Sequence, residues 1–256
     1  MGRGDVGGPG SALIFRDLPD GLAAGATTRQ LAPDGLGAGE TARRLAEALG
    51  AASAEISRVV QVHGCEVVEV SGPAVRGGDR VRGEADALIT EMPDRLLAVS
   101  TADCVPILLA DPETGWLAAV HAGWRGTALR IVDAVLDRLE NRGVSPRNLL
   151  ALFGPSISGS AYEVGPEVTG ALRKALPAEA MAGGGIQPGR GDRSHVDLGL
   201  VNEALLLLRG VSAGRVRREP LCTATDADRF PSFRREGPRA GRIVTGIVRI
   251  ERPLGA

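Results

Sequence analysis

Short apolar runs at near-regular spacing fill the middle of the chain and predict a buried β-sheet. They are too short for typical helices, and runs of this kind are typical of strands that are covered on both faces. We expect all of them to belong to one sheet. The runs are Ala87–Thr90, Leu96–Ser100, Val105–Ala110 and Trp116–Val120.

Further runs with strand character lie on both sides of this block. Arg58–His63 and Val67–Val70 alternate around His63 and Gly64, so we expect these two strands to form a hairpin-like or bulged pair. That arrangement would place His63 at a strand end. The other predicted strands are Ala12–Phe15, Leu149–Phe153 and Arg242–Ile250.

Amphipathic stripes predict helices, each followed by a glycine that allows the chain to leave the helix in a left-handed conformation. The predicted helices are Glu40–Leu49 before Gly50, Thr127–Asn141 before Gly143, and Asp197–Arg209 before Gly210, with Asp197 as N-cap of the last. Two stretches rich in small or polar residues have no period that would bury a face, and we predict loops there. They are Gly21–Gly39 and Ser71–Gly83.

Length and composition favour one large domain. The chain has 256 residues, of which 43% are hydrophobic, enough for a substantial core. No linker or internal repeat divides residues 11–256, which we predict to form a single catalytic domain of α/β or α+β class. Residues 1–10 are rich in glycine and are predicted to be a disordered tail.

Charge and composition exclude several classes of function. Lys plus Arg number 30 and Asp plus Glu 31, so no net field would attract nucleic acid or an anionic membrane. Aromatic residues make up 3% of the chain, too few for the stacking platforms of single-strand binders. No apolar segment is long enough to span a bilayer, and the first ten residues lack a secretion signal. We therefore expect a cytoplasmic protein that acts on a small molecule, as a monomer or small homo-oligomer.

The scarcest residue types mark the candidate site. Among three cysteines and three histidines, Cys104, His121 and His63 each lie at or beside the end of an apolar run. One Cys and two His at the mouth of a sheet can hold a catalytic metal with one position left open. Asp103 and the nearby Pro106 mark an irregular junction around Cys104, where side chains are often directed at ligands.

The remaining candidates have simpler interpretations. Cys65 points away from His63 if both lie in one strand, and is predicted to be structural. His195 precedes a helix, where a solvated or capping role is expected, and the role of Cys222 stays open. An odd number of cysteines without short repeated spacing favours reduced thiols.

The turn Gly123–Gly126 lies between a predicted strand and a predicted helix. Unpaired N–H groups and the helix dipole at such a position favour an anion such as phosphate. The glycines of this turn also permit close approach of the backbone to a ligand.

Together, these residues resemble the YfiH family, also called the laccase-domain, multicopper polyphenol oxidase or peptidoglycan editing factor family, whose members are described as purine nucleoside phosphorylases. The resemblance extends from about residue 58 to the C-terminus. It rests on Gln-Val-His-Gly at 61–64, Ala-Asp-Ala-Leu-Ile-Thr at 85–90, Thr-Ala-Asp-Cys-Val-Pro at 101–106, Ala-Val-His-Ala-Gly-Trp-Arg-Gly-Thr at 119–127, Gly-Pro-Ser-Ile at 154–157, Tyr-Glu-Val-Gly at 162–165, Cys-Thr at 222–223 and Phe-Pro-Ser-Phe-Arg-Arg at 230–235.

The resemblance implies a layered sandwich of mixed β-sheet flanked by helices, with a catalytic zinc bound by His63, Cys104 and His121. It also implies phosphorolysis of adenosine, inosine, guanosine and methylthioadenosine, with adenosine deamination as a side activity. This chain departs from the family pattern in the unrecognisable N-terminal motifs around Gly21–Gly39, in Ser156 where many relatives carry cysteine, and in Pro231.

The number of possible metal ligands decides which of the activities in the family's names this chain could have. A multicopper oxidase requires many histidines, and three in the whole chain exclude it, although a single copper could still be held by two His and one Cys. Zinc is better supported, because a Cys/His₂ set with an open position is typical of hydrolytic and transfer sites. A zinc nucleoside-deaminase signature is absent, since the sequence contains no Cys-x-x-Cys.

We predict that zinc acts as a Lewis acid, with Asp103 tuning the site as a partner of its ligands. The predicted catalytic residues are thus Cys104, His121, His63 and Asp103. The predicted substrate-binding residues are Trp124, Arg125, Gly126, Ser156 and Arg234.

Two alternatives remain open. Cys104 could act as a thiolate nucleophile paired with His121, on an amide such as a peptidoglycan precursor. The protein could instead sense a nucleotide without catalysis.

Overall fold

A computed structural model describes residues 12–251, and the predicted disordered tail lies outside that range. Two mixed six-stranded sheets make up most of this part of the chain. In spatial order, the first sheet contains β1 (Leu13–Ile14), β2 (Leu22–Ala26), β15 (Ile243–Arg249), β7 (Arg95–Thr101), β3 (Glu55–Val60) and β5 (Asp79–Glu84). The second contains β14 (Val216–Arg218), β10 (Leu150–Phe153), β8 (Val105–Ala110), β9 (Leu117–Ala122), β6 (Ala87–Thr90) and β4 (Val67–Glu69).

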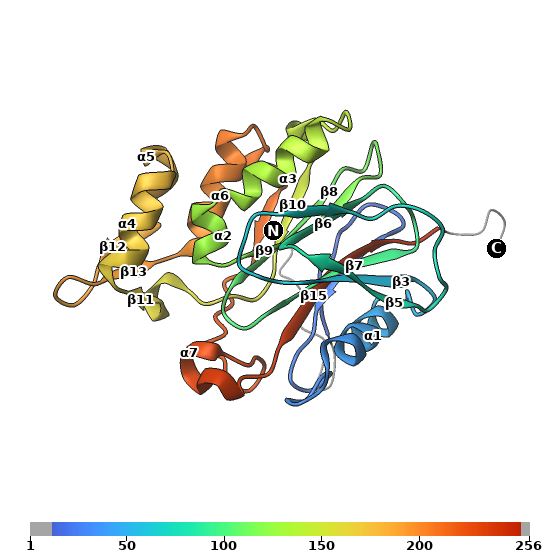
Figure 1. The fold of residues 1–256 in the computed structure, drawn as a ribbon, viewed down its shortest axis with the longest axis horizontal. Helices are drawn as coiled ribbons and strands as arrows, with labels where there is room; N and C mark the ends of the chain where they lie inside the picture. The colour runs from blue at the N-terminus through green and yellow to red at the C-terminus, as the bar shows by residue number, and fades with distance from the viewer. Residues whose placement is uncertain (1–11, 252–256) are drawn as a thin grey trace.

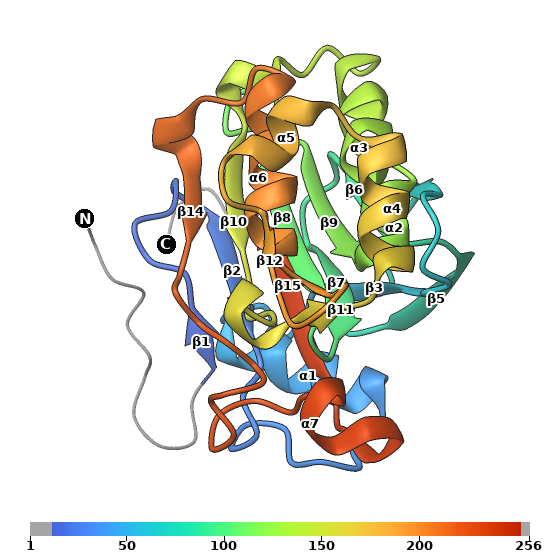
Figure 2. The same ribbon diagram turned by 90° about the vertical axis from the view of Figure 1, so that its left-hand side faces the viewer.

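Helices cover the outer faces of both sheets (Figure 1). The first sheet is covered by α1 (Ala38–Ala48), and the second by α2 (Trp124–Ala128), α3 (Ile131–Glu140) and α6 (Leu198–Leu208). Two further helices, α4 (Pro166–Ala175) and α5 (Ala178–Ala182), pack against α2 and α6. The short helix α7 (Phe233–Glu236) lies toward the α1 end of the molecule, away from α3 and α6 (Figure 2). A small third sheet contains β11 (Glu163–Val164), β13 (Ser194–Val196) and β12 (Ile186–Pro188), and short 3-10 helices span Pro146–Asn148, Gly159–Ala161, Ala213–Arg215 and Gly237–Arg239.

Alternation along the strands builds the layers. In β7, Leu97 and Val99 point into the core between the two sheets, whereas Leu96 and Ala98 pack under α1 with Leu45. Successive strand residues point to opposite faces, so a strand that is covered on both sides is apolar throughout. The predicted α/β fold, a layered sandwich of mixed sheets flanked by helices, is confirmed. The prediction of a single domain stays a prediction.

The prediction that the central runs form one sheet is wrong. Leu96–Ser100 belongs to β7 in the first sheet, while the other three runs form β6, β8 and β9 in the second. The central strands of both sheets are buried on both faces, so β6, β7, β8 and β9 have the same apolar pattern and only packing separates them.

The predicted pairing of Arg58–His63 with Val67–Val70 is also wrong. β3 pairs in parallel with β5 and β7, and β4 pairs in parallel with β6 in the other sheet. The segment between β3 and β4 therefore crosses from one sheet to the other, and it carries His63.

Both predicted loops contain strands. Residues 22–26 form β2, made of small residues that pack closely, since a Cβ on Gly25 would lie 2.6 Å from the Leu13 carbonyl oxygen. Residues 79–84 form β5, an exposed edge strand without an apolar face. Neither has the side-chain pattern from which strands are predicted.

The predicted helix Thr127–Asn141 is split. Arg130 adopts a left-handed conformation with φ of 62°, which ends α2 and begins α3. The other predicted helices are confirmed, and Asp197 caps α6 by accepting a hydrogen bond from the Leu200 N–H at 2.8 Å. Within residues 12–251 no helix has both the length and the apolarity needed to cross a membrane.

Candidate metal centre and adjoining cavities

Antiparallel pairing brings Cys104 and His121 together. Cys104 immediately precedes β8 and His121 lies near the end of β9, and Val105 pairs with Ala122. The start of one antiparallel strand and the end of its neighbour meet at the same edge of the sheet. Two residues that lie 17 positions apart in the sequence are thus placed side by side by β8 and β9.

His63 reaches this edge on the segment that crosses between the sheets. Gln61 holds the segment to β7 through its amide, which donates to the Ser100 carbonyl oxygen at 2.8 Å and accepts from the Ser100 N–H at 2.7 Å. His63 itself has a φ of 60°, a left-handed conformation that a non-glycine residue rarely adopts. The crossing is therefore anchored locally, and its strained residue is one of the candidate ligands.

The buried carboxylate of Asp86 organises this crossing. It accepts hydrogen bonds from the N–H groups of His63 at 3.0 Å and Gly64 at 2.6 Å, with Val62 farther away at 3.3 Å. The segment thus forms a concave row of N–H donors around an anion. Burial raises the pKa of the Asp86 carboxyl, but the hydrogen bonds from His121 and Gly64 outweigh it and leave the pKa below its ordinary value.

Asp86 also orients His121. Its Oδ1 lies 2.7 Å from Nδ1 of His121, and both side chains are buried. An ionised carboxylate can only accept, so Nδ1 carries the proton and Nε2 is left available to a metal or an acid. Sequence reasoning missed Asp86, although a charged residue just before the apolar run Ala87–Thr90 was a visible signal.

Electrostatics favour a negative charge on the Cys104 sulfur. Burial raises the pKa of the thiol, but hydrogen bonds from His121 and His63 outweigh this effect and lower the pKa to about 7. For His121 the directions are reversed. Burial lowers the pKa of the imidazole, but hydrogen bonds to Asp86 and Cys104 outweigh this effect and raise the pKa to about 9. A metal ion that binds these groups must therefore displace protons.

The cluster has the composition and spacing of a metal centre. One ligand atom from each of His63, Cys104 and His121 lies within 4.8 Å of the other two. Tetrahedral zinc with these ligand types requires separations of about 3.5 Å, so a small contraction would close the site. A Cβ on Gly123 would lie 3.0 Å from Cys104 Sγ and 3.1 Å from His63 Cδ2, so a larger residue there would displace these two side chains by a few tenths of an ångström.

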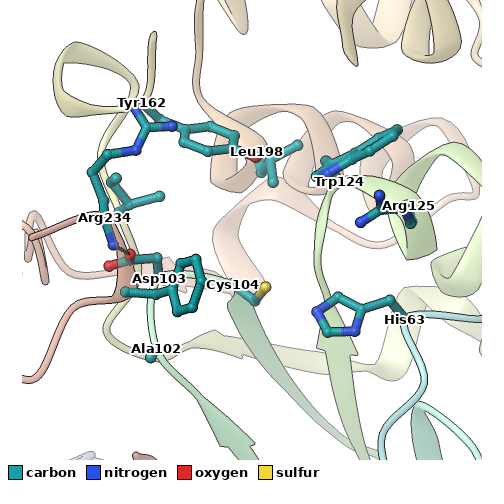
Figure 3. Close-up of a pocket in the computed structure, with 11 residues that line it drawn as sticks. His63, Ala102, Asp103, Cys104, Trp124, Arg125, Tyr162, Leu198 and Arg234 are labelled. Carbon is teal, nitrogen blue, oxygen red and sulfur yellow. Dashed lines mark hydrogen bonds between the residues drawn. The ribbon is translucent and has the colours of Figure 1, made fainter. Parts of the chain in front are cut away.

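A cavity of about 280 Å³ opens onto His63 and Cys104 (Figure 3). Trp124 and Arg125 lie on one side, with the guanidinium 4.4 Å from the centre of the Trp124 ring, and Tyr162 and Arg234 lie on the other. The Arg234 guanidinium lies 5.0 Å from the centre of the Tyr162 ring. The other lining residues are Ala102, Asp103, Ile157, Leu198 and Phe233.

Asp103 holds one wall of this cavity. Its Oδ1 accepts from the Thr223 hydroxyl and its Oδ2 from the Arg234 N–H, both at 2.6 Å. The carboxylate thereby fixes the start of α7 beside Cys104. Asp103 was predicted to tune the site as a partner of the metal ligands, and that role stays a prediction; the hydrogen bond to His121 comes from Asp86.

The structure brings most of the predicted site residues together. Trp124, Arg125 and Arg234 line the cavity, whereas Gly126 packs beneath the Gly64 carbonyl oxygen, 3.0 Å from where its Cβ would lie. The backbone of Ser156 forms an isolated parallel β-bridge with Cys222, and Ser156 lines a different cavity. Tyr162 and Phe233, both inside the family-like motifs, were not predicted as site residues.

The side chains with simpler interpretations lie outside the cluster. His195 makes a hydrogen bond of 3.2 Å from Nδ1 to the Gly159 carbonyl oxygen, and Cys65 packs against the core beneath the second sheet. The Cys222 sulfur accepts hydrogen bonds from the N–H and hydroxyl of Ser158.

Comparisons with known proteins identify relatives in sequence and in fold. A family model described as "Multi-copper polyphenol oxidoreductase laccase" matches residues 38–250. A protein of Deinococcus radiodurans named purine nucleoside phosphorylase is 40% identical over 81% of this chain and 76% of its own. Adenosine deaminase RL5, from an unknown prokaryotic organism, is 37% identical over 74% of this chain and 73% of its own. The crystal structure of YlmD from Geobacillus stearothermophilus superimposes with a TM-score of 0.81 at 28% identity, covering 91% of this chain and 93% of the other.

Proposed function

Since the chain belongs to the laccase-like YfiH family, whose model is described as multi-copper polyphenol oxidoreductase laccase, we propose that it is a zinc-dependent purine nucleoside phosphorylase. The observation that carries the proposal is the Cys/His₂ cluster, supported by Asp86, at the mouth of a cavity with aromatic walls. Relatives named purine nucleoside phosphorylase support the reaction class. The substrates are purine nucleosides, with adenosine, inosine, guanosine and methylthioadenosine as candidates.

The residues of the cluster fit zinc. His63, Cys104 and His121 would hold the ion, and Asp86 would keep Nε2 of His121 free to bind it. When bound, zinc supplies a Lewis acid that can hold and polarise an oxygen of a reactant at the open fourth position. Copper is the less favoured ion, because three histidines in the whole chain cannot build a multicopper centre.

The cavity residues bind and orient the nucleoside. Trp124, Tyr162 and Phe233 offer aromatic surface for a purine, and the cavity volume of about 280 Å³ fits a small ligand. Arg125, which forms no ion pair within residues 12–251, offers a cation beside the cluster. We propose that the Arg125 guanidinium attracts the anion. The dipole of the helix after Gly123–Gly126, from which an anion site was predicted, adds less than expected, because α2 ends at Ala128.

The reaction balances without an external acid. An oxygen of hydrogen phosphate bonds to the ribose C1′ while the C1′–N9 bond breaks and its electron pair leaves with the purine. The proton of the hydrogen phosphate ends on a purine nitrogen, which yields the free base and ribose 1-phosphate. Positioning and charge matter more than a strong base, because an oxocarbenium-like ribose accepts a weak nucleophile.

Adenosine deamination is a second candidate activity, favoured by the relative named adenosine deaminase RL5. Water would then add to C6 of the purine at the same cluster, the C6–N6 bond would break, and ammonia would leave with a proton from the water, which yields inosine. The Cys104–His121–Asp86 chain also has the order of a thiol, imidazole and carboxylate triad, which favours the cysteine-hydrolase alternative. A second imidazole, that of His63, also forms a hydrogen bond to the Cys104 sulfur. Two imidazoles at one sulfur favour a metal centre over a cysteine hydrolase.

The test is to incubate the zinc-loaded protein with adenosine, with and without phosphate, and to separate adenine, inosine and ribose 1-phosphate by chromatography. Phosphate-dependent adenine with equal ribose 1-phosphate, lost in Cys104→Ala and on chelation, supports the proposal. Cys222→Ala, which removes a thiol outside the cluster, should retain turnover. Inosine alone identifies a deaminase, and activity that survives chelation but not Cys104→Ala identifies a cysteine hydrolase.

A further inference from the structure

A second cavity, of about 580 Å³, meets the cluster from another side. His63, Cys104 and His121 all line it, whereas His121 does not line the smaller cavity. The two cavities share Arg125 and Phe233 as well as His63 and Cys104. The cluster therefore lies where the two spaces meet, and a ligand in either one can reach it.

The second cavity is cationic. Arg58, Arg125 and Arg242 line it, and its lining contains no carboxylate. Arg58 is neutralised by Asp79 through two hydrogen bonds of 2.8 and 2.7 Å. Within residues 12–251 neither Arg125 nor Arg242 forms an ion pair, so two positive charges remain uncompensated beside the cluster.

Arg242 keeps donors available for a ligand. Its Nη1 donates to the carbonyl oxygens of Ala240 at 2.7 Å and Gly241 at 3.0 Å, which anchors one arm of the guanidinium. Nε and Nη2 have no partner among the described residues. A guanidinium fixed at one nitrogen, with others free, is suited to an oxyanion with several acceptors.

The hydroxyl of Thr101 adds a further polar atom without a partner. Thr101 lines the second cavity with 2% of its surface exposed, and its Oγ1 forms no hydrogen bond within the described part of the chain. An unpaired buried hydroxyl is unfavourable, because its hydrogen bonds to water in the unfolded chain are not replaced.

The smaller cavity contrasts with this one. Its walls are largely apolar and aromatic, its carboxylate is bonded to Thr223 and Arg234, and its second arginine, Arg234, donates to the Glu163 carbonyl oxygen at 2.9 Å. A largely apolar space, in which Asp103 and Arg234 already have partners, favours a purine. A space that adds Arg242 to Arg125 favours a phosphate group.

We propose that the second cavity binds the phosphate co-substrate between Arg125 and Arg242, while the aromatic cavity holds the purine. This assignment rests on the proposed function. The ribose C1′ then lies at the junction of the two cavities, with the phosphate oxygen and the departing N9 on opposite sides of it. Arg242 is a binding residue for the nucleophile alone, whereas Arg125 lines both cavities and serves both reactants.

The experiment measures steady-state phosphorolysis by zinc-loaded Arg242→Ala, with phosphate and adenosine varied separately. Losing charge-assisted hydrogen bonds should raise KM for phosphate about tenfold or more, with KM for adenosine changed by less than about twofold. Arg242→Lys should recover part of the loss. Arg239→Ala is the matched control, because Arg239 is an exposed arginine of the same segment that lines neither cavity.

A second arm identifies the source of the phosphate group. Inorganic phosphate and adenosine 5′-monophosphate are titrated calorimetrically into the wild type and Arg242→Ala. Phosphate binding weakened by the substitution supports the proposal, whereas Arg242-dependent binding of the monophosphate alone assigns the cavity to a nucleotide and overturns it. If the wild type phosphorolyses adenosine and Arg242→Ala behaves like Arg239→Ala, the cavity assignment fails while the function stands. If the wild type shows no phosphate-dependent turnover, both fail.

Discussion

Replacing Asp86 with asparagine is the most decisive perturbation of the proposed metal centre. The buried carboxylate receives His121 Nδ1 and the His63 N–H on Oδ1, and the N–H groups of Gly64 and Val62 on Oδ2. An amide has only one accepting oxygen, so in either orientation two donors face an NH₂ group. Only His121 among these donor residues is buried, since Val62 and His63 are exposed and Gly64 is half-buried, so the free energy of unfolding should fall by about 1–3 kcal/mol.

The effect on the metal should be separable from the effect on stability. If the amide NH₂ faces His121, the imidazole can accept at Nδ1 only by moving its proton to Nε2, the nitrogen that zinc needs. We therefore expect zinc affinity to fall about 10- to 100-fold. Competition with a chromophoric chelator measures the affinity, and nitrogen-detected NMR of His121 reports the tautomer.

Asp111→Asn is the matched control. Asp111 is also buried, and its carboxylate accepts from the Glu113 N–H at 2.9 Å and the Thr114 hydroxyl at 2.8 Å, in a turn that does not contact the cluster. This variant should lose stability and keep wild-type zinc affinity. Wild-type zinc affinity in a folded Asp86→Asn protein would refute the assignment of Asp86 as the residue that orients His121.

Three further predictions follow from particular contacts. Gly123→Ala should weaken zinc binding about tenfold, because its Cβ would lie 3.0 Å from Cys104 Sγ. Gly170→Ala in α4, where nothing lies within 4 Å, should instead add about 0.5–1 kcal/mol to the free energy of unfolding. Chelator competition and urea unfolding measure both variants, and equal zinc affinity in the two would contradict the predicted crowding at Cys104. Asp103→Asn should speed hydrogen exchange at the Arg234 N–H and raise KM for the nucleoside, and unchanged exchange would show that α7 is held by other contacts. Burial raises the pKa of Asp133, but hydrogen bonds from Arg130 and Arg209 outweigh this effect and lower the pKa. The stabilisation from the ionised carboxylate is therefore present above the unfolded pKa near 4 and is lost as pH falls through the lower folded pKa. The difference in unfolding free energy between wild type and Asp133→Asn should shrink below about pH 4, and a constant difference would contradict the lowered pKa.

Local pattern predicted much of the candidate site. His63, Cys104 and His121 were identified because scarce, chemically active residues lie at the ends of apolar runs, and Trp124, Arg125 and Arg234 belong to motifs that the resemblance carries. All six line one or both cavities at the cluster. Asp86 lies inside the motif at 85–90, but its role was not predicted. The sequence does not show which N–H groups surround a carboxylate in the folded chain.

Arg242 and Phe233 show where sequence reasoning ended. Both lie more than a hundred residues from Cys104 in the sequence. Arg242 lines the second cavity because β15 is inserted between β2 and β7, and Phe233 lines both cavities because Asp103 anchors the start of α7. No periodicity near either residue indicates a cavity. Their position depends on strand order, which is set by packing between distant segments.

The sequence by itself determined which segments are strands and helices over most of the chain, the N-cap of α6, and the donor types of the metal centre. Tertiary structure decided that β7 joins a different sheet from β6, β8 and β9, that the His63 segment crosses between the sheets, and that α2 ends before Arg130. The reason is physical. Side-chain period reports which faces of a segment are buried, but strands buried on both faces look alike, and only the competing long-range contacts of the folded chain choose their neighbours.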